Sequence, residues 1–237
     1  MNNVLRICAT TLILSSSGAV YAHMTLNNAI YAQDWAGAYV GASGGYSQTK
    51  DFGTGHNKGL STPNSWTHNS HLNDVPLGFF GGYNWIINNN LLVGLETEYL
   101  HRKSHSGRTS KYSTSAIGTD YSAKTKIKGA ASIRARIGGF FNQQQTLAYV
   151  TLGQSNAKVE RIWIDSLGAD TKSQKGWHNG WTAGIGLEHK YFEKLSIRAE
   201  IRHSNYGEEL ITMDLWDKFY KKNLTENSAV IGLAYSF

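Results

Sequence analysis

The side chains of this chain best suited to ligand chemistry are its histidines. Six of the nine lie in or beside segments that we expect to be long loops: His56, His68, His71, His101, His105 and His178. A neutral imidazole can ligate haem iron, and rings such as those of Trp66, Tyr112, Trp163 and Trp177 could flank a flat porphyrin. No pair of these histidines has the spacing typical of a metal site, so solvated loop side chains are the simpler interpretation.

Serine beside histidine raises the question of an enzyme. A nucleophilic serine needs a histidine base that is itself oriented by an acid. His68 with Ser70 and His203 with Ser204 are the candidate pairs, and neither has a recognisable acid partner. Adjacent residues such as His203 and Ser204 also point to opposite faces of a strand. The sequence therefore predicts a protein without catalysis.

A third group of polar residues alternates with apolar ones. It contains both signs of charge: Glu96, Glu98, Arg134, Arg136, Glu188, Arg198, Glu200 and Arg202. The same alternation places Lys126 and Lys128 on the polar side and Ile127 on the apolar side. If the polar side faces the inside of a narrow barrel, the opposite charges can pair and so offset the cost of leaving water. We expect a salt-bridged filling, with a charged channel lining as the alternative.

The element that positions many of these charges is a hairpin, GWTAGIGLEHKYFEKLSIRAEIRH, at 180–203. Each strand alternates apolar residues with small or charged ones, and the turn is Phe192-Glu193-Lys194. In a soluble sheet, glycine has no reason to gather on the polar face. In a transmembrane barrel the apolar face meets lipid, while small and charged groups face inward. The hairpin fits the transmembrane barrel better.

Six further segments alternate in the same way, which makes eight. They are 35–48, 77–87, 91–101, 125–141, 146–156 and 227–237. The connections alternate between short (88–90, 142–145, 192–194) and long (49–76, 102–124, 157–179, 205–226). An even number of strands with alternating short and long connections is typical of bacterial outer membrane barrels. We therefore predict an all-β fold, an eight-stranded antiparallel up-and-down transmembrane β-barrel with four long extracellular loops.

Composition agrees with this fold class and helps to divide the chain. The sequence has 25 Gly and 2 Pro and carries a formal charge of +6. It has no run of about 18 apolar residues, as a membrane helix would need. Residues 1–22 resemble a signal peptide, with Arg6 as their only charge and Val20-Tyr21-Ala22 before the cleavage site. We expect a signal peptide at 1–22, a short N-terminal segment at 23–34 and the barrel domain at 35–237. Cleavage would remove Cys8, the single cysteine, so the mature chain would have no disulfide.

The two ends of the strands carry further signals. Aromatic residues fall where membrane interfaces are expected: Trp85, Tyr235 and Phe237 at the inner rim, and Tyr46, Phe79, Tyr99 and Trp181 at the outer rim. The last strand presents Ile231, Leu233, Tyr235 and Phe237 at alternate positions, with Phe237 as the final residue. This pattern resembles the sorting signal by which the barrel-assembly machinery recognises its substrates.

Several stretches carry a family resemblance. They are WAGAYVGASGGYS (35–47), SIRARIGGFF (132–141), LAYVTLG (147–153), the hairpin continued to Gly207, and the terminal AYSF. Together they resemble the outer membrane protein beta-barrel family, which includes opacity-like surface antigens, immunogenic outer membrane proteins of alphaproteobacteria and some relatives described as hemin-binding. The resemblance implies an eight-stranded barrel in the outer membrane and implies little about activity.

From these observations we expect a surface protein of the Gram-negative cell outer membrane, with a structural or surface-interaction role and no cofactor. Two alternatives stay open: hemin as a ligand of the loop histidines, and a small porin-like channel. The expected partners are outer membrane lipids and lipopolysaccharide, the barrel-assembly machinery, and hemin or host surface molecules, but no nucleic acid. The basic segment 102–124, which includes Arg102 and Lys124, could hold lipopolysaccharide phosphates or host sulfated glycans.

Overall fold

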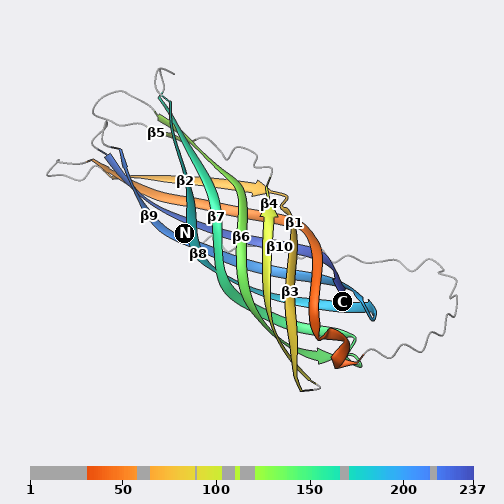
Figure 1. Ribbon diagram of the computed structural model, residues 1–237. Coiled ribbons are helices and arrows are strands. Elements are labelled where there is room, and N and C mark those ends of the chain that lie inside the picture. Colours follow the sequence, from red (N-terminus) through yellow and green to blue (C-terminus); the bar gives the residue numbers. More distant parts are fainter. Residues whose placement is uncertain are drawn as a thin grey trace, which may run out of the picture.

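The computed structural model describes residues 31–57, 65–88, 90–102, 110–112, 121–165, 171–213 and 218–237. Strands make up most of them (Figure 1). The elements are η1 (Ala32–Trp35), β1 (Gly37–Asn57), β2 (Ser65–Asp74), β3 (Leu77–Asn88), β4 (Leu91–His101), β5 (Ser110–Tyr112), β6 (Tyr121–Phe141), β7 (Thr146–Asp165), β8 (Thr171–Phe192), β9 (Leu195–Met213) and β10 (Lys218–Ser236). In this part of the chain no helix is long and apolar enough to cross a membrane.

The strands close into a ring. The order of pairing is β10-β9-β8-β7-β6-β4-β3-β1, and β1 pairs again with β10, from Tyr39 opposite Ser236 to Asn57 opposite Lys218. Every pairing is antiparallel. β2 continues the wall beyond β3 by pairing with β1, and β5 pairs with β6. The predicted all-β, antiparallel, up-and-down barrel is therefore confirmed.

The alternation of the sequence becomes an inside and an outside. On β4, residues 92, 94, 96, 98 and 100 are buried while the residues between them are exposed or half-buried. Across the middle of the barrel the exposed side chains are apolar, for example Leu95, Ile133, Leu152, Ile185 and Ile201. Because the apolar face points outward, the barrel is suited to lipid rather than to water.

The strands are much longer than a membrane crossing requires. β6, β7 and β8 contain 21, 20 and 22 residues, whereas a tilted transmembrane strand needs roughly 9–11. A strand of about 20 residues, tilted by roughly 40°, rises about 50 Å, which is twice the apolar band of about 25 Å. We call the part beyond the band the outer extensions: residues 49–57, 65–74, 110–112, 121–128, 157–165, 171–179, 205–213 and 218–226.

The predicted extent of the four long loops is therefore wrong. Large parts of 49–76, 102–124, 157–179 and 205–226 are strand, and the gaps between the described residues there are 58–64, 103–109, 113–120, 166–170 and 214–217. The reason is physical: the outward face of an outer extension meets water, so it does not need the apolar residues by which a strand is recognised. Lys50, His71 and Lys158 occupy such outward positions.

A β-bulge interrupts β6. The register against β7 shifts between Ile127 and Gly129, so Lys128 is an extra residue in β6. Inward residues are even-numbered below the bulge, as at Arg134, and odd-numbered above it, as at Ile127, which is 1% exposed. The predicted inward direction of Lys126 and Lys128 and outward direction of Ile127 are therefore wrong, because an extra residue exchanges the two faces of a strand.

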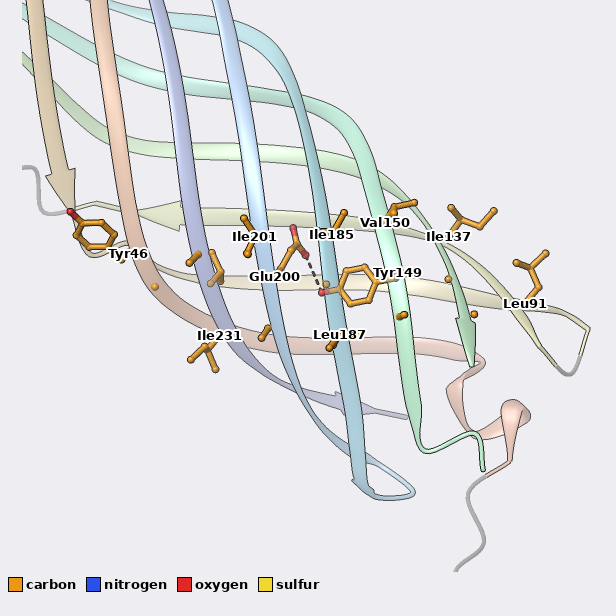
Figure 2. Close-up of a pocket in the computed structure, with 18 residues that line it drawn as sticks. Tyr46, Leu91, Ile137, Tyr149, Val150, Ile185, Leu187, Glu200, Ile201 and Ile231 are labelled. Carbon is orange, nitrogen blue, oxygen red and sulfur yellow. Dashed lines mark hydrogen bonds between the residues drawn. The ribbon is translucent and has the colours of Figure 1, made fainter. Parts of the chain in front are cut away.

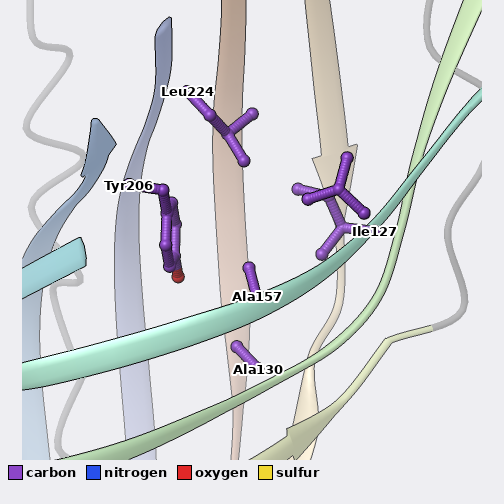
Figure 3. Close-up of a cluster of buried hydrophobic side chains, with 6 residues drawn as sticks. Ile127, Ala130, Ala157, Tyr206 and Leu224 are labelled. Atoms are coloured by element: carbon purple, nitrogen blue, oxygen red, sulfur yellow. The ribbon is translucent and has the colours of Figure 1, made fainter. Parts of the chain in front are cut away.

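Layers of side chains fill the interior. Trp35, Leu92, Leu147 and Tyr149 form a buried apolar cluster at the end where the short turns lie, and Tyr39 packs on Phe80 nearby. Where the outer extensions begin, β6, β7, β9 and β10 contribute a second buried cluster (Figure 3), which contains Ile127, Ala130, Ala157, Val159, Tyr206 and Leu224. The predicted charged residues lie between these two layers.

Candidate functional site

At the centre of the lumen, Arg134 contacts three glutamates. Its Nη1 donates a hydrogen bond to Glu200 Oε1 at 2.6 Å, and its Nη2 binds Glu96 and lies 3.2 Å from Glu98 Oε2. Glu96 is the residue directly opposite Arg134 in the ladder between β4 and β6. The fork of a guanidinium allows one arginine to serve several carboxylates in this way.

Two arginines on β9 complete the connection between the walls. Arg198 binds Glu96 and lies 3.9 Å from Glu98. Arg202 donates to Glu98 at 2.6 Å and to Glu200 at 2.9 Å. β4 and β9 thereby face each other across the lumen through ion pairs.

Arg136 and Glu188 form a further pair nearer the short-turn end. Two tyrosines connect the charged residues to the apolar layer. Tyr39 donates a hydrogen bond to Glu96 at 2.9 Å, and Tyr149 donates one to Glu200 at 3.1 Å. Arg136 also stacks over the ring of Tyr149 at 4.1 Å from its centroid. Charge, hydrogen bonds and rings therefore form one connected filling.

All eight predicted lumen residues are buried, and they carry four positive and four negative charges. Burying an unpaired charge is costly, so a narrow lumen can hold this many charges only when their signs balance and each ion is hydrogen-bonded. The sequence indicated the signs and the inward direction of these residues. It did not indicate the pairs that cross the lumen, such as Arg198 with Glu96, because these join strands that are distant in the chain.

Sequence reasoning missed the role of Trp35, which it took for the first residue of a strand. Trp35 lies in η1 and is 2% exposed. Its indole Nε1 donates to the carbonyl of Gln144 at 2.9 Å, and the Gln144 side chain accepts from the Ala32 amide at 2.6 Å. Lys190 Nζ lies 5.1 Å from the centroid of the Trp35 ring. The N-terminal segment therefore covers the short-turn end of the lumen.

Within the outer extensions, Asp51 is the centre of a second polar group. It accepts a hydrogen bond from Thr125 at 2.7 Å and has Arg161 at 3.3 Å and Lys222 at 3.4 Å. Burial alone would raise the pKa of Asp51, but the charges of Lys222 and Arg161 outweigh that effect and lower it to about 2. The carboxylate thus stays ionised inside the extension.

Arg102 does not belong to a basic outer surface, as the sequence led us to expect. It is 3% exposed, binds Glu226 and lies 3.5 Å from Asp74. Its position at the end of β4 turns it into the barrel, where it forms buried ion pairs. Of the other charges in 102–124, those at 103–109 and 113–120 lie outside the described residues.

The described histidines that were considered for hemin are distributed over four strands, β1, β2, β4 and β8. His71 and His101 are exposed on β2 and β4, whereas His178 is buried in the barrel wall and lies 3.3 Å from Arg161. Four of the histidines are in strands at positions expected to be loop, namely His56, His68, His71 and His178, whereas His101 ends a strand as expected and His105 lies outside the described residues. Among the described residues no group of three His, Cys, Asp or Glu could hold a metal. Hemin binding stays a prediction.

Of the two serine and histidine pairs, His203 with Ser204 does not form a catalytic set. His203 lies against Trp181 and hydrogen-bonds Asn227 on the outer face, while Ser204 is buried and donates to Thr182. Ser70 is buried inside the wall. The adjacent pair on β9 therefore separates to opposite faces, as strand geometry requires.

The residues of the expected assembly signal all face outward. Ile231, Leu233, Tyr235 and Phe237 are 43–70% exposed along β10. The rings of Tyr235 and Phe237 meet edge to face at 5.6 Å, and the Phe237 amide donates to the carbonyl of Ala38. These residues thus lie at the end of the strand that closes the barrel, and their role as an assembly signal stays a prediction.

The outer surface of β6–β10 is hollowed at mid-height (Figure 2). The hollow has a volume of about 990 Å³ and is lined by apolar side chains such as Ile137, Val150, Ile185 and Leu187. Tyr149 and Glu200, whose hydrogen bond is drawn in Figure 2, lie behind it on the inward face. The hollow is part of the apolar outer face and is separate from the charged lumen.

Comparison with known proteins agrees with this geometry. The family model described as outer membrane protein beta-barrel domain matches residues 8–237. The chain is 26% identical over 217 residues to the 31 kDa outer-membrane immunogenic protein of Brucella melitensis, covering 86% of this chain and 84% of that protein. It is 28% identical over 181 residues to the 25 kDa outer-membrane immunogenic protein of Brucella ovis, covering 76% and 74%. The solved structure of OprG from Pseudomonas aeruginosa is similar with a TM-score of 0.48 and 14% identity, covering 85% of this chain and 96% of that one.

Three observations are consistent with one another. The family model matches nearly the whole chain, the outer face of the barrel is apolar, and hydrogen bonds close the ring of strands. The chain belongs to the outer membrane protein β-barrel family and is located in the cell outer membrane.

Proposed function

We propose that this protein is a closed barrel with a structural and surface-interaction role, and that it neither conducts solutes nor catalyses a reaction. The observation that carries the proposal is the filled lumen. Arg134, Arg198 and Arg202 connect Glu96, Glu98 and Glu200 through ion pairs that link opposite walls. An eight-stranded ring leaves an interior that side chains can fill, so no open path is expected through this layer.

The short-turn end supports the same proposal. Trp35 covers the lumen there and is held by two hydrogen bonds that join Ala32 and Trp35 to Gln144. An ion would therefore have to displace both the N-terminal segment and the buried ion pairs. The small-channel alternative requires such a displacement.

The outer extensions support a role at the cell surface. With about half of each long strand beyond the apolar band, the barrel wall itself projects roughly 25 Å from the membrane. A rigid wall held by backbone hydrogen bonds presents side chains in fixed positions, which favours recognition by a partner. The partner in this proposal is a molecule of the surface environment, and no catalytic set in the described residues points to a substrate.

The test is a conductance measurement. The refolded mature chain is inserted into planar bilayers, and insertion is verified by the shift in electrophoretic mobility that folded barrels show on heating. We expect no current steps above those of the bare bilayer, whereas an open porin handled in the same way gives steps. Stable steps from the folded chain would overturn the closed-lumen proposal and favour the small channel.

A further inference from the structure

A basic surface lies on the outward face of β6, β7 and β8, within the outer extensions. It consists of Lys124, Lys126, Lys128, Lys158 and Lys175, with Glu160 among them, and we call it the lysine surface. Five positive charges and one negative charge give it a formal charge of +4. The β-bulge of β6 gives these lysines their direction, because an unbroken alternation from Arg134 would turn the even-numbered Lys124 and Lys126 toward the interior.

The ladders bring these lysines together. Glu160 lies opposite Lys126 on one side and opposite Lys175 on the other. Lys128 Nζ is 2.8 Å from Glu160 Oε2, and Lys175 Nζ is 3.5 Å from Oε1. The hydrogen bond from Lys128 and the neighbouring positive charges hold the pKa of Glu160 below its ordinary value, so the carboxylate is ionised and orders the lysines around it.

The lysine surface lies beyond the apolar residues of the outer face, at the height where lipid headgroups are expected. Along the outward face of β7 the side chains change from Ala148, Val150 and Leu152 to Gln154 and Asn156, and then to Lys158. Ala148 and Val150 of this series line the hollow of Figure 2, which also extends over β6 and β8. Cations therefore stand above an apolar hollow on the same three strands.

Two tryptophans of β8 lie beside the lysine surface, Trp181 opposite Gln154 and Trp177 opposite Lys158. Trp181 and Trp177 are exposed on β8, and Lys158 Nζ is 5.8 Å from the centroid of the Trp177 ring. Exposed indoles favour the membrane interface, since the ring is apolar and its N–H needs a polar partner. This places the lysines just outside the acyl region.

The neighbouring strands β9 and β10 differ in charge. On β9 and β10 the exposed Lys221 is paired with the exposed Glu208 at 2.6 Å, so their charges cancel. A net positive surface directly above an apolar hollow is thus a feature of β6–β8 among the described outer extensions. Charge complementarity selects an anionic headgroup, and the hollow selects a ligand with acyl chains.

We propose that the lysine surface and the hollow below it bind a phosphorylated lipid of the outer leaflet, with its phosphate groups on the lysines and its acyl chains along β6–β8. This binding goes beyond a closed lumen and depends only on the orientation of the barrel in the membrane. The conductance test and the lipid test can therefore fail independently.

The experiment titrates the folded barrel in detergent with bis-phosphorylated lipid A and counts bound lipid by native mass spectrometry. One variant carries Lys126→Gln, Lys158→Gln and Lys175→Gln. The matched control carries Lys50→Gln, Lys194→Gln and Lys221→Gln, which removes the same charge elsewhere. Heat-modifiable mobility confirms that both variants are folded.

We expect the lysine-surface variant to bind lipid A about 100-fold more weakly, since each lysine near an anionic headgroup contributes roughly fivefold. The control should change affinity by less than about threefold, and lipid A without phosphates should bind the original chain as weakly as the variant binds lipid A. Equal losses in the two variants would overturn the proposal. A heparin-derived oligosaccharide bound as tightly as lipid A, and lost in the same variant, would also overturn it and assign the surface to a soluble polyanion.

Discussion

Glu96 on β4 and Arg198 on β9 form an ion pair across the lumen, although three strands of the ring separate them in either direction. The pair therefore acts as a strut between opposite walls. Both side chains are 1% exposed.

Replacing Glu96 by Gln should destabilise the barrel strongly. The change leaves Arg198 and Arg134 with one carboxylate fewer in a buried site, and breaking a buried ion pair costs on the order of 3–5 kcal/mol. Urea unfolding in detergent, followed by tryptophan fluorescence, measures the effect. Glu208→Gln is the control, because Glu208 pairs with Lys221 at the surface and an exposed pair contributes about 1 kcal/mol or less. Equal effects of the two variants would contradict a buried strut.

Replacing Gly186 by Ala should also destabilise the barrel, for steric reasons. A Cβ at this position would lie 2.4 Å from Cζ of Tyr149, the ring whose hydroxyl donates to Glu200. Overpacking of this kind costs about 1–3 kcal/mol. At Gly139, by contrast, the nearest atom to an added Cβ is 3.6 Å away, so Gly139→Ala should change the free energy of unfolding by roughly 0.5 kcal/mol or less. Identical unfolding midpoints for the two variants would refute the close packing of Tyr149.

The stability of the outer extensions should depend on pH through Asp51, whose pKa is about 2 in the folded state against an ordinary value of 3.8. Because the folded pKa is the lower one, the unfolded chain takes up the proton first as the pH falls. The contribution of Asp51 is complete above about pH 5 and decreases toward pH 2, by about 2 kcal/mol in all.

The measurement for Asp51 is the difference in unfolding free energy between the original chain and Asp51→Asn at pH 6, 4 and 2.5. We expect this difference to decrease steadily as the pH falls. Thr125→Val serves as the companion variant, since it removes the hydrogen bond to Asp51 and leaves the carboxylate. A difference independent of pH would show that Asp51 does not titrate below its ordinary range.

Removing Phe237 should impair assembly in the cell more than it impairs stability. The side chain is 70% exposed, so its loss should cost the refolded barrel about 1 kcal/mol or less. If the assembly machinery reads the outward row on β10, the amount of folded protein in the outer membrane should fall severalfold. Quantifying the heat-modifiable form in outer membrane fractions, beside refolding yield in detergent, separates the two effects. Unchanged amounts in the membrane would exclude Phe237 from the signal.

The membrane half of the fold could be predicted because lipid imposes a simple requirement. Ile137, Val150, Ile185 and Ile201 must face outward, and each alternates with an inward residue of another kind. A period of two then identifies strands and faces together. The inward direction of the charged cluster follows from the same period.

The outer half could not be predicted in the same way, because water imposes no such requirement. His71 and Lys50 are exposed and lie opposite each other on β2 and β1, where the sequence looks like a polar loop. The N-terminal cover could not be recognised either, since nothing in the spacing of Trp35 indicates its distant partner Gln144. One signal for the bulge was present: Gly129, Ala130 and Ala131 interrupt the alternation of β6.

The bulge has a consequence for how this barrel can change through evolution. Below Lys128 the even-numbered residues of β6 face inward, and above it the odd-numbered residues do. Because the bulge already absorbs one extra residue, loss of Lys128 would leave a regular strand in which Ile127 still faces inward and Lys126 still faces outward, while Arg134 and its partners below kept their places. The molecule thus has a position at which the chain can differ in length by one residue while both parts of the strand keep their inward and outward faces.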